Sequence, residues 1–209
     1  MVTTIALPKL DGLQPTPHST LLKLVEEAGE LSRAILQLGQ KPDDPTLLAE
    51  VVGELLDVAQ TCVTMIFVME EMQGVYIDPL IDAHLEKLDA KGYAFDHALS
   101  YAIFTKGRFK YMALPQLELP EVDLLRTACK IQEELGELTQ FLGKRQGASG
   151  ETADLSDLEA AHGCALELLD VAQCCFTMMY ILAARYQVDL KQAVDRHVRK
   201  LCRKGYCRL

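Results

Sequence analysis

The sequence predicts an all-α fold built from two similar helical units. The heptapeptide Glu-Leu-Leu-Asp-Val-Ala-Gln occurs twice, at residues 54–60 and 167–173. Apolar residues recur at helical spacing over long stretches that contain no proline. No segment shows the sustained alternation or the turn residues of a β-hairpin, so we expect no sheet. We therefore expect helical units at residues 1–93 and 113–209, joined by a connector at 94–112.

The first unit should contain three helices. The first should begin after the prolines near its start and end near Gly39. A longer helix is expected from about 46 to 72, because no proline interrupts its apolar pattern. The third, from about 79 to 90, precedes Gly92, a natural cap for the C-terminal end of a helix.

The second unit repeats this plan, with helices expected at about 123–142, 158–186 and 190–203. The loop at 143–157 is longer than its counterpart and contains glycines, so we expect it to be mobile. The connector at 94–112 should carry one short helix.

Composition limits the classes of partner. The net charge is -9 and the pI about 5.0, which argues against binding to a nucleic-acid polymer. The N-terminus lacks the features of a signal peptide, and the continuous apolar runs are shorter than the roughly 20 residues of a membrane span. The seven cysteines include no Cys-x-x-Cys pair and do not suggest a disulfide framework. We expect a cytoplasmic protein with reduced cysteines and no membrane partner.

Each unit carries two acidic motifs in the same order. The first, Glu-Glu-x-x-Glu, precedes the second, Glu-x-x-Asp, and residues three apart on a helix share a face. If the two helices pack antiparallel, four carboxylates converge and repel one another unless a divalent cation or protons intervene. One such motif alone is most often a solvated helix face; here it occurs in both units among apolar residues. The acids are Glu26, Glu27, Glu30, Glu54 and Asp57, and Glu133, Glu134, Glu137, Glu167 and Asp170.

Together with the closing Lys-Gly-Tyr of each unit, these motifs resemble the MazG-like all-α nucleoside triphosphate pyrophosphohydrolases. That group is related to the dimeric dUTPases and to phosphoribosyl-ATP pyrophosphohydrolase. The resemblance covers most of each half. It implies two units packed as an intramolecular pseudo-dimer, with a further homodimer left open. It also implies Mg²⁺, with Mn²⁺ as an alternative, and hydrolysis of (deoxy)nucleoside triphosphates to monophosphate and pyrophosphate, as in housecleaning of the nucleotide pool. The implied metal ligands are Glu27, Glu30, Glu54 and Asp57, and Glu134, Glu137, Glu167 and Asp170.

The resemblance also suggests roles for other residues. Glu26 or Glu30, and Glu133 or Glu137 in the second unit, could accept the proton of an attacking water. Similar proteins have Asn where this chain has its two closing-helix histidines, and a half-buried structural histidine explains that position equally well. The expected substrate-binding residues are His84, Lys87, Lys91, Tyr93, His197, Lys200, Lys204 and Tyr206.

Two other functions fit the sequence. The substrate could be phosphoribosyl-ATP or another nucleotide derivative. The chain could instead be a non-catalytic helical regulator that binds a nucleotide, a metal or a protein. The sequence leaves the base and sugar specificity open.

Overall fold

A computed structural model describes residues 3–145 and 157–208, with side chains described at 3–140 and 159–208. The structure is mostly helical, as the sequence predicts, and the helix boundaries lie within a few residues of the expected ones. The predicted mobile loop at 143–157 falls largely outside the described residues. The helices are α1 (Pro17–Gln40), α2 (Pro45–Gln73), α3 (Ile81–Ala90), α4 (Leu124–Arg145), α5 (Asp157–Tyr186) and α6 (Leu190–Arg203), with a 3-10 turn, η1 (Asp78–Leu80), before α3.

Local sequence sets the ends of the first two helices. Thr16 caps α1 by accepting a hydrogen bond from the backbone N–H of Ser19, whose hydroxyl in turn accepts from the N–H of Thr16. Asp44 caps α2, and Gly74 ends it in the left-handed conformation at φ 68°. These caps fix where α1 and α2 begin and where α2 ends.

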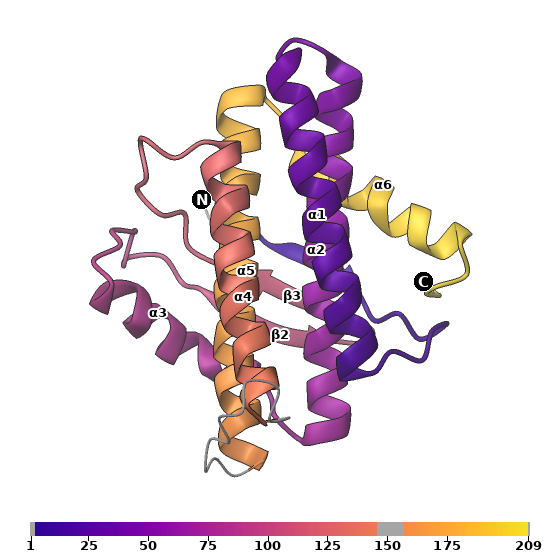
Figure 1. Cartoon of the computed structure of the whole chain (residues 1–209), viewed down its shortest axis with the longest axis vertical. Coiled ribbons are helices and arrows are strands. Elements are labelled where there is room, and N and C mark those ends of the chain that lie inside the picture. Colours follow the sequence, from indigo (N-terminus) through magenta and orange to yellow (C-terminus); the bar gives the residue numbers. More distant parts are fainter. Residues whose placement is uncertain (1–2, 146–156, 209) are drawn as a thin grey trace.

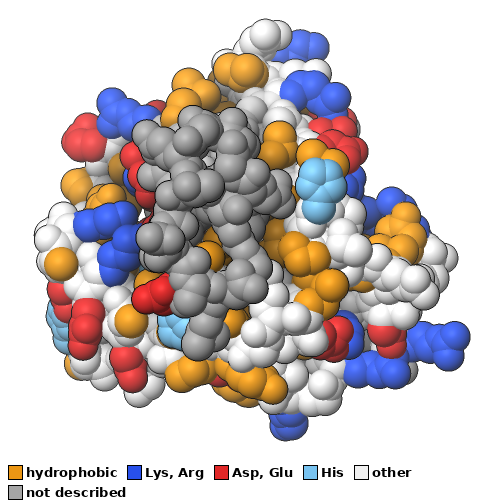
Figure 2. Space-filling view, turned by 60° about the horizontal axis from the view of Figure 1, so that its bottom comes forward, with side chains coloured by type: hydrophobic (Ala, Val, Ile, Leu, Met, Phe, Trp, Pro, Cys, Tyr) orange, Lys and Arg blue, Asp and Glu red, His pale blue; other side chains and the backbone are white. Residues whose placement is uncertain are grey.

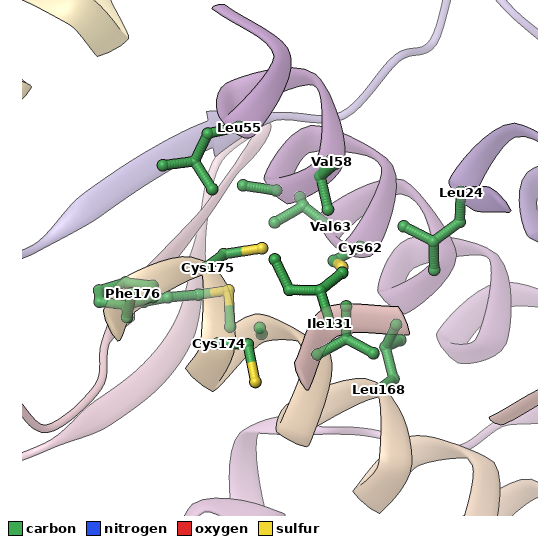
Figure 3. Close-up of a cluster of buried hydrophobic side chains, with 14 of the residues drawn as sticks. Leu24, Leu55, Val58, Cys62, Val63, Ile131, Leu168, Cys174, Cys175 and Phe176 are labelled. Carbon is green, nitrogen blue, oxygen red and sulfur yellow. The ribbon is translucent and has the colours of Figure 1, made fainter. Parts of the chain in front are cut away.

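Helices α1, α2, α4 and α5 pack side by side as a bundle, with α3 and α6 at its flanks (Figure 1). The core lies where α2 meets α5, and Leu24 of α1 and Ile131 of α4 close it (Figure 3). Cys62 and Cys175 face each other there as buried apolar side chains.

By length and composition, α2 and α5 are each long and apolar enough to cross a membrane. In the structure, 83% of the most apolar stretch of α2 and 67% of that of α5 are buried, as in the central helices of a bundle.

The prediction that the chain contains no sheet is wrong. Strands β1 (Ile5–Pro8), β2 (Ala102–Lys106) and β3 (Phe109–Ala113) form an antiparallel sheet in the order β1-β3-β2. Strands β2 and β3 make a hairpin that turns at Gly107, with φ 63°, where one short helix was expected. The hairpin lacks a clear apolar alternation because an inward position of β3 is Lys110.

Lys110 anchors the hairpin to the bundle. Its side chain is fully buried, and its Nζ lies 2.6 Å from Glu70 Oε1 and 2.9 Å from Asp78 Oδ1. The same Nζ lies 5.3 Å from the centre of the Phe67 ring. A buried ammonium is tolerated only when it is paired, and these two carboxylates supply the pairs.

Candidate metal centres

The first acidic cluster forms where α1 packs against α2. Carboxylate oxygens of Glu27, Glu30 and Glu54 all lie within 4.8 Å of one another. Leu24 and Ala28, one turn away on the same stripe of α1, are buried in the core. Packing of this apolar stripe therefore turns the acids toward α2. Burial, then the charge of Glu30, raise the pKa of Glu54, and Asp57, one turn beyond Glu54, adds to the shift.

The second cluster forms in the same way between α4 and α5. Glu134, Glu167 and Asp170 have carboxylate oxygens within 4.8 Å of one another. Glu137 is exposed and lies outside this group, although its charge helps to raise the pKa of Glu167. The structure thus brings together three of the four predicted acids in each half, and the missing member differs: Asp57 in the first, Glu137 in the second.

The acids of each half also meet a lysine from the closing helix of the other half of the chain. Lys200 of α6 places Nζ 2.6 Å from Asp57 Oδ2, and His197 Nδ1 lies 3.7 Å from Asp57 Oδ1. Lys87 of α3 places Nζ 2.5 Å from Asp170 Oδ2 and 3.2 Å from Glu167 Oε1. The resemblance predicts these lysines at the substrate phosphates; it does not reveal the crossing.

The two histidines are buried beside the acids. His84 is 0% exposed, with Nδ1 3.3 Å from Asp170 Oδ1 and Nε2 3.5 Å from Gln173 Oε1. Burial lowers the pKa of His197 to about 4, against the attraction of Asp57. Burial raises the pKa of Asp170, but His84 and Lys87 outweigh it and hold that pKa at about 2. Both imidazoles are therefore shielded from solvent and lie against an aspartate, Asp170 for His84 and Asp57 for His197.

Two clefts open at the clusters and differ in size. The first, about 630 Å³, is lined by its acids together with Lys200, Lys204 and Tyr206. The second is about 220 Å³ and includes Lys91 and Tyr93. The tyrosines and outer lysines predicted to meet substrate therefore line the clefts. Lys91 also reaches Asp170 Oδ2 at 3.6 Å.

No family model, curated protein or solved structure matches this chain.

The donor set fits a hard divalent cation. Burial, and secondarily nearby carboxylates, raise the pKa values of Glu27 and Glu54, so their anionic forms are disfavoured without a counter-charge. In the second cluster, Glu134 is 2% exposed and its Oε2 has no hydrogen-bond partner among the described residues. Converging oxygens with a spare acceptor are what Mg²⁺ and Mn²⁺ bind. Either cluster could hold such an ion.

A lysine that sequence reasoning missed holds the outer acid of each motif. Lys23 Nζ lies 3.0 Å from Glu26 Oε1 and 2.7 Å from Glu27 Oε1. Lys130 does the same, at 3.0 Å from Glu133 and 2.6 Å from Glu134. Glu26 and Glu133 are exposed and lie outside the converging groups. The missed signal is a lysine three residues before Glu-Glu in both halves.

The two glycines within the acidic motifs have no packing role. A Cβ at Gly29 or Gly136 would meet no described atom within 4 Å, so a close approach of another helix does not explain either glycine.

On the face that Figure 2 presents, basic and acidic side chains are interspersed with scattered hydrophobic ones.

Proposed function

We propose that the chain is a divalent-cation-dependent pyrophosphohydrolase of (deoxy)nucleoside triphosphates. The observation that carries this proposal is the placement of an acid cluster and lysine ammonium groups in one cleft, twice. Carboxylates suit a cation, and lysines suit the phosphate oxygens that the cation does not reach. A polyphosphate that carries a divalent cation complements both the carboxylates and the lysines.

In the first cleft, Glu27, Glu30 and Glu54 would hold Mg²⁺, with Mn²⁺ as an alternative. Bound there, the ion would neutralise phosphate charge and lower the pKa of a water molecule. Lys200 and Lys204 line the same cleft and would hold the leaving pyrophosphate. Water would attack the α-phosphorus, and the bond from that phosphorus to the oxygen that bridges the α- and β-phosphates would break, so that pyrophosphate leaves. A half-buried carboxylate such as Glu30 would take the proton of the water.

We also propose that the two halves form an intramolecular pseudo-dimer of MazG-like units. Glu26 corresponds to Glu133 in the repeat, and by the same offset Ile5 corresponds to Met112. Ile5 and Met112 lie opposite each other where β1 pairs with β3. The amide of Gln60 donates to Pro8 O at 2.9 Å, and the repeated amide of Gln173 donates to Pro115 O at 2.9 Å. Equivalent contacts in both halves support a two-fold relation.

The test is a panel of triphosphates with Mg²⁺ or Mn²⁺, scored separately for pyrophosphate and for phosphate. Glu54→Gln combined with Glu167→Gln, one member of each cluster, should abolish pyrophosphate release while the circular dichroism of the helices persists. A matched control replaces the exposed Glu50 and Glu86, outside both clusters, by Gln and should retain activity. Full activity in the first double variant would reject the assignment.

The same panel separates the alternatives. Cleavage of phosphoribosyl-ATP in preference to every triphosphate would change the substrate and keep the site. A wild-type protein that binds Mn²⁺ but cleaves nothing would favour a non-catalytic regulator.

A further inference from the structure

A pair of cysteines brackets the turn that closes the chain. Cys202 lies near the end of α6 and Cys207 just beyond it, with their sulfur atoms 3.0 Å apart. Both are free thiols. Cys207 is buried at 3% exposure, whereas Cys202 is partly exposed and therefore open to a small reagent. A disulfide needs about 2.0 Å between the sulfurs, so a movement of roughly 1 Å would join them.

The bracketed turn lines the first cleft. Gly205 has φ 75°, and the N–H of Tyr206 donates to Leu201 O at 3.0 Å, which closes the helix end. Tyr206 and Lys204 line the cleft, and Tyr206 O accepts a hydrogen bond from the N–H of Gly12 at 3.0 Å. Movement of this turn therefore changes the wall of the first cleft.

The first half contains the same turn without the cysteines. Gly92 has φ 80°, and the N–H of Tyr93 donates to Leu88 O at 3.0 Å. Asp89 and Ala94 stand at the positions of the two cysteines. The turn thus forms without sulfur chemistry, and the thiol pair is an addition to one cleft only.

We propose that Cys202 and Cys207 are a redox pair whose reversible disulfide fixes the closing turn beside the first cleft. The oxidant is a small-molecule disulfide. The Cys202 thiolate attacks one of its sulfurs and expels the first small thiol. The Cys207 thiolate then attacks Cys202 Sγ, breaks the mixed disulfide and expels the second. Two protein thiols are oxidised by two electrons, the small disulfide is reduced, and the two protons leave on its thiols.

Exposure and acidity set this order of attack. Burial, and secondarily the neighbouring Cys202, raise the pKa of Cys207 to about 12, so its thiolate is scarce at first. The better exposed Cys202 reacts first. Its modification removes the neighbouring thiol that helps to keep Cys207 protonated.

Mass spectrometry after trypsin tests the bond directly. The chain is equilibrated in reduced and oxidised glutathione, acid-quenched and alkylated. Trypsin cuts after Lys200, Arg203, Lys204 and Arg208, so a disulfide leaves Leu201–Arg203 joined to Gly205–Arg208. The exposed Cys129 is the internal control and should carry a glutathione adduct. A glutathione adduct that persists on Cys202, or an unmodified pair when Cys129 is labelled, overturns the proposal.

Hydrogen exchange tests what the bond does, independently of any catalytic activity. Oxidation should slow exchange of the Tyr206 amide several-fold and leave the Tyr93 amide unchanged. Cys207→Ser should abolish the redox dependence and leave Cys202 as a glutathione adduct. Equal exchange at Tyr206 in the two redox states would show that the turn is not fixed, and would reject the proposal.

Discussion

The crossing of α3 to the second cluster can be measured as a coupling energy. The perturbations are Lys87→Met and Asp170→Asn, made singly and together. Lys87→Met combined with Asp57→Asn tests the alternative in which α3 serves the cluster of its own half. Because a double-mutant cycle subtracts the cost of each single change, repulsion among the remaining acids largely cancels.

The structure sets the size of the coupling. Lys87 Nζ lies 2.5 Å from Asp170 Oδ2, and the two side chains are 27% and 5% exposed. Fully exposed pairs are worth about 0.2–1 kcal/mol, and coupling energies of close, desolvated charge pairs are about 1.5–7 kcal/mol. A pair with one buried and one partly exposed member should lie between these limits, at about 2 kcal/mol. Lys87 and Asp57 should show a coupling of about zero, as distant sites do.

The assay is unfolding in urea, with a chelator present so that no metal contributes to stability. The control cycle pairs Lys200 with Asp57, which lie 2.6 Å apart, and should also give a favourable coupling. A coupling of Lys87 to Asp57 that equals or exceeds its coupling to Asp170 would refute the crossing.

Three further predictions use the same unfolding assay. Lys110→Met should destabilise the fold by about 3 kcal/mol, since Glu70 would keep a nearly buried charge without its partner; a change below about 1 kcal/mol would contradict this. The pKa of His197 is about 4 when folded and 6.5 when free, so the folded state binds fewer protons in between. The contribution of His197 to stability should therefore fall by about 3 kcal/mol as pH drops from 6.5 to 4, and His197→Asn should remove this contribution from the pH dependence. Gly12→Ala should cost about 1–3 kcal/mol, because its Cβ would lie 2.1 Å from a backbone oxygen. The control Gly53→Ala, in open space within α2, should instead stabilise by about 0.5–1 kcal/mol.

Helix positions could be predicted because the evidence for them is local. The end of α2 is set by Gly74, whose left-handed conformation few other residues adopt. The predicted range 190–203 coincides with α6, because Asp189 supplies a side-chain cap and the apolar residues that follow keep helical spacing. Such signals lie within a few residues of the boundary they determine.

The sheet could not be predicted because its evidence is not local. Strand β3 lies between β1 and β2, and β1 comes from the start of the first unit, far from β3 in the sequence. The inward side chain of Lys110 breaks the apolar alternation that would reveal β3. It is neutralised by Glu70 and Asp78, which are distant in the sequence.

The acid clusters were visible in the sequence because three-residue spacing on a helix fixes a shared face. The source of the cations was not, because helical periodicity does not say against which helix a face will pack. Asp57 meets a lysine of α6, and Asp170 meets one of α3. Neither half therefore supplies both the acids and the closing-helix lysine that meets them, although Lys23 and Lys130 pair with acids of their own half. Cleaving the chain within 94–112 and separating the pieces should leave each acid cluster without that lysine, and only re-association would restore it. The crossed arrangement makes the duplicated chain the smallest unit in which both sets of acids keep their closing-helix lysines.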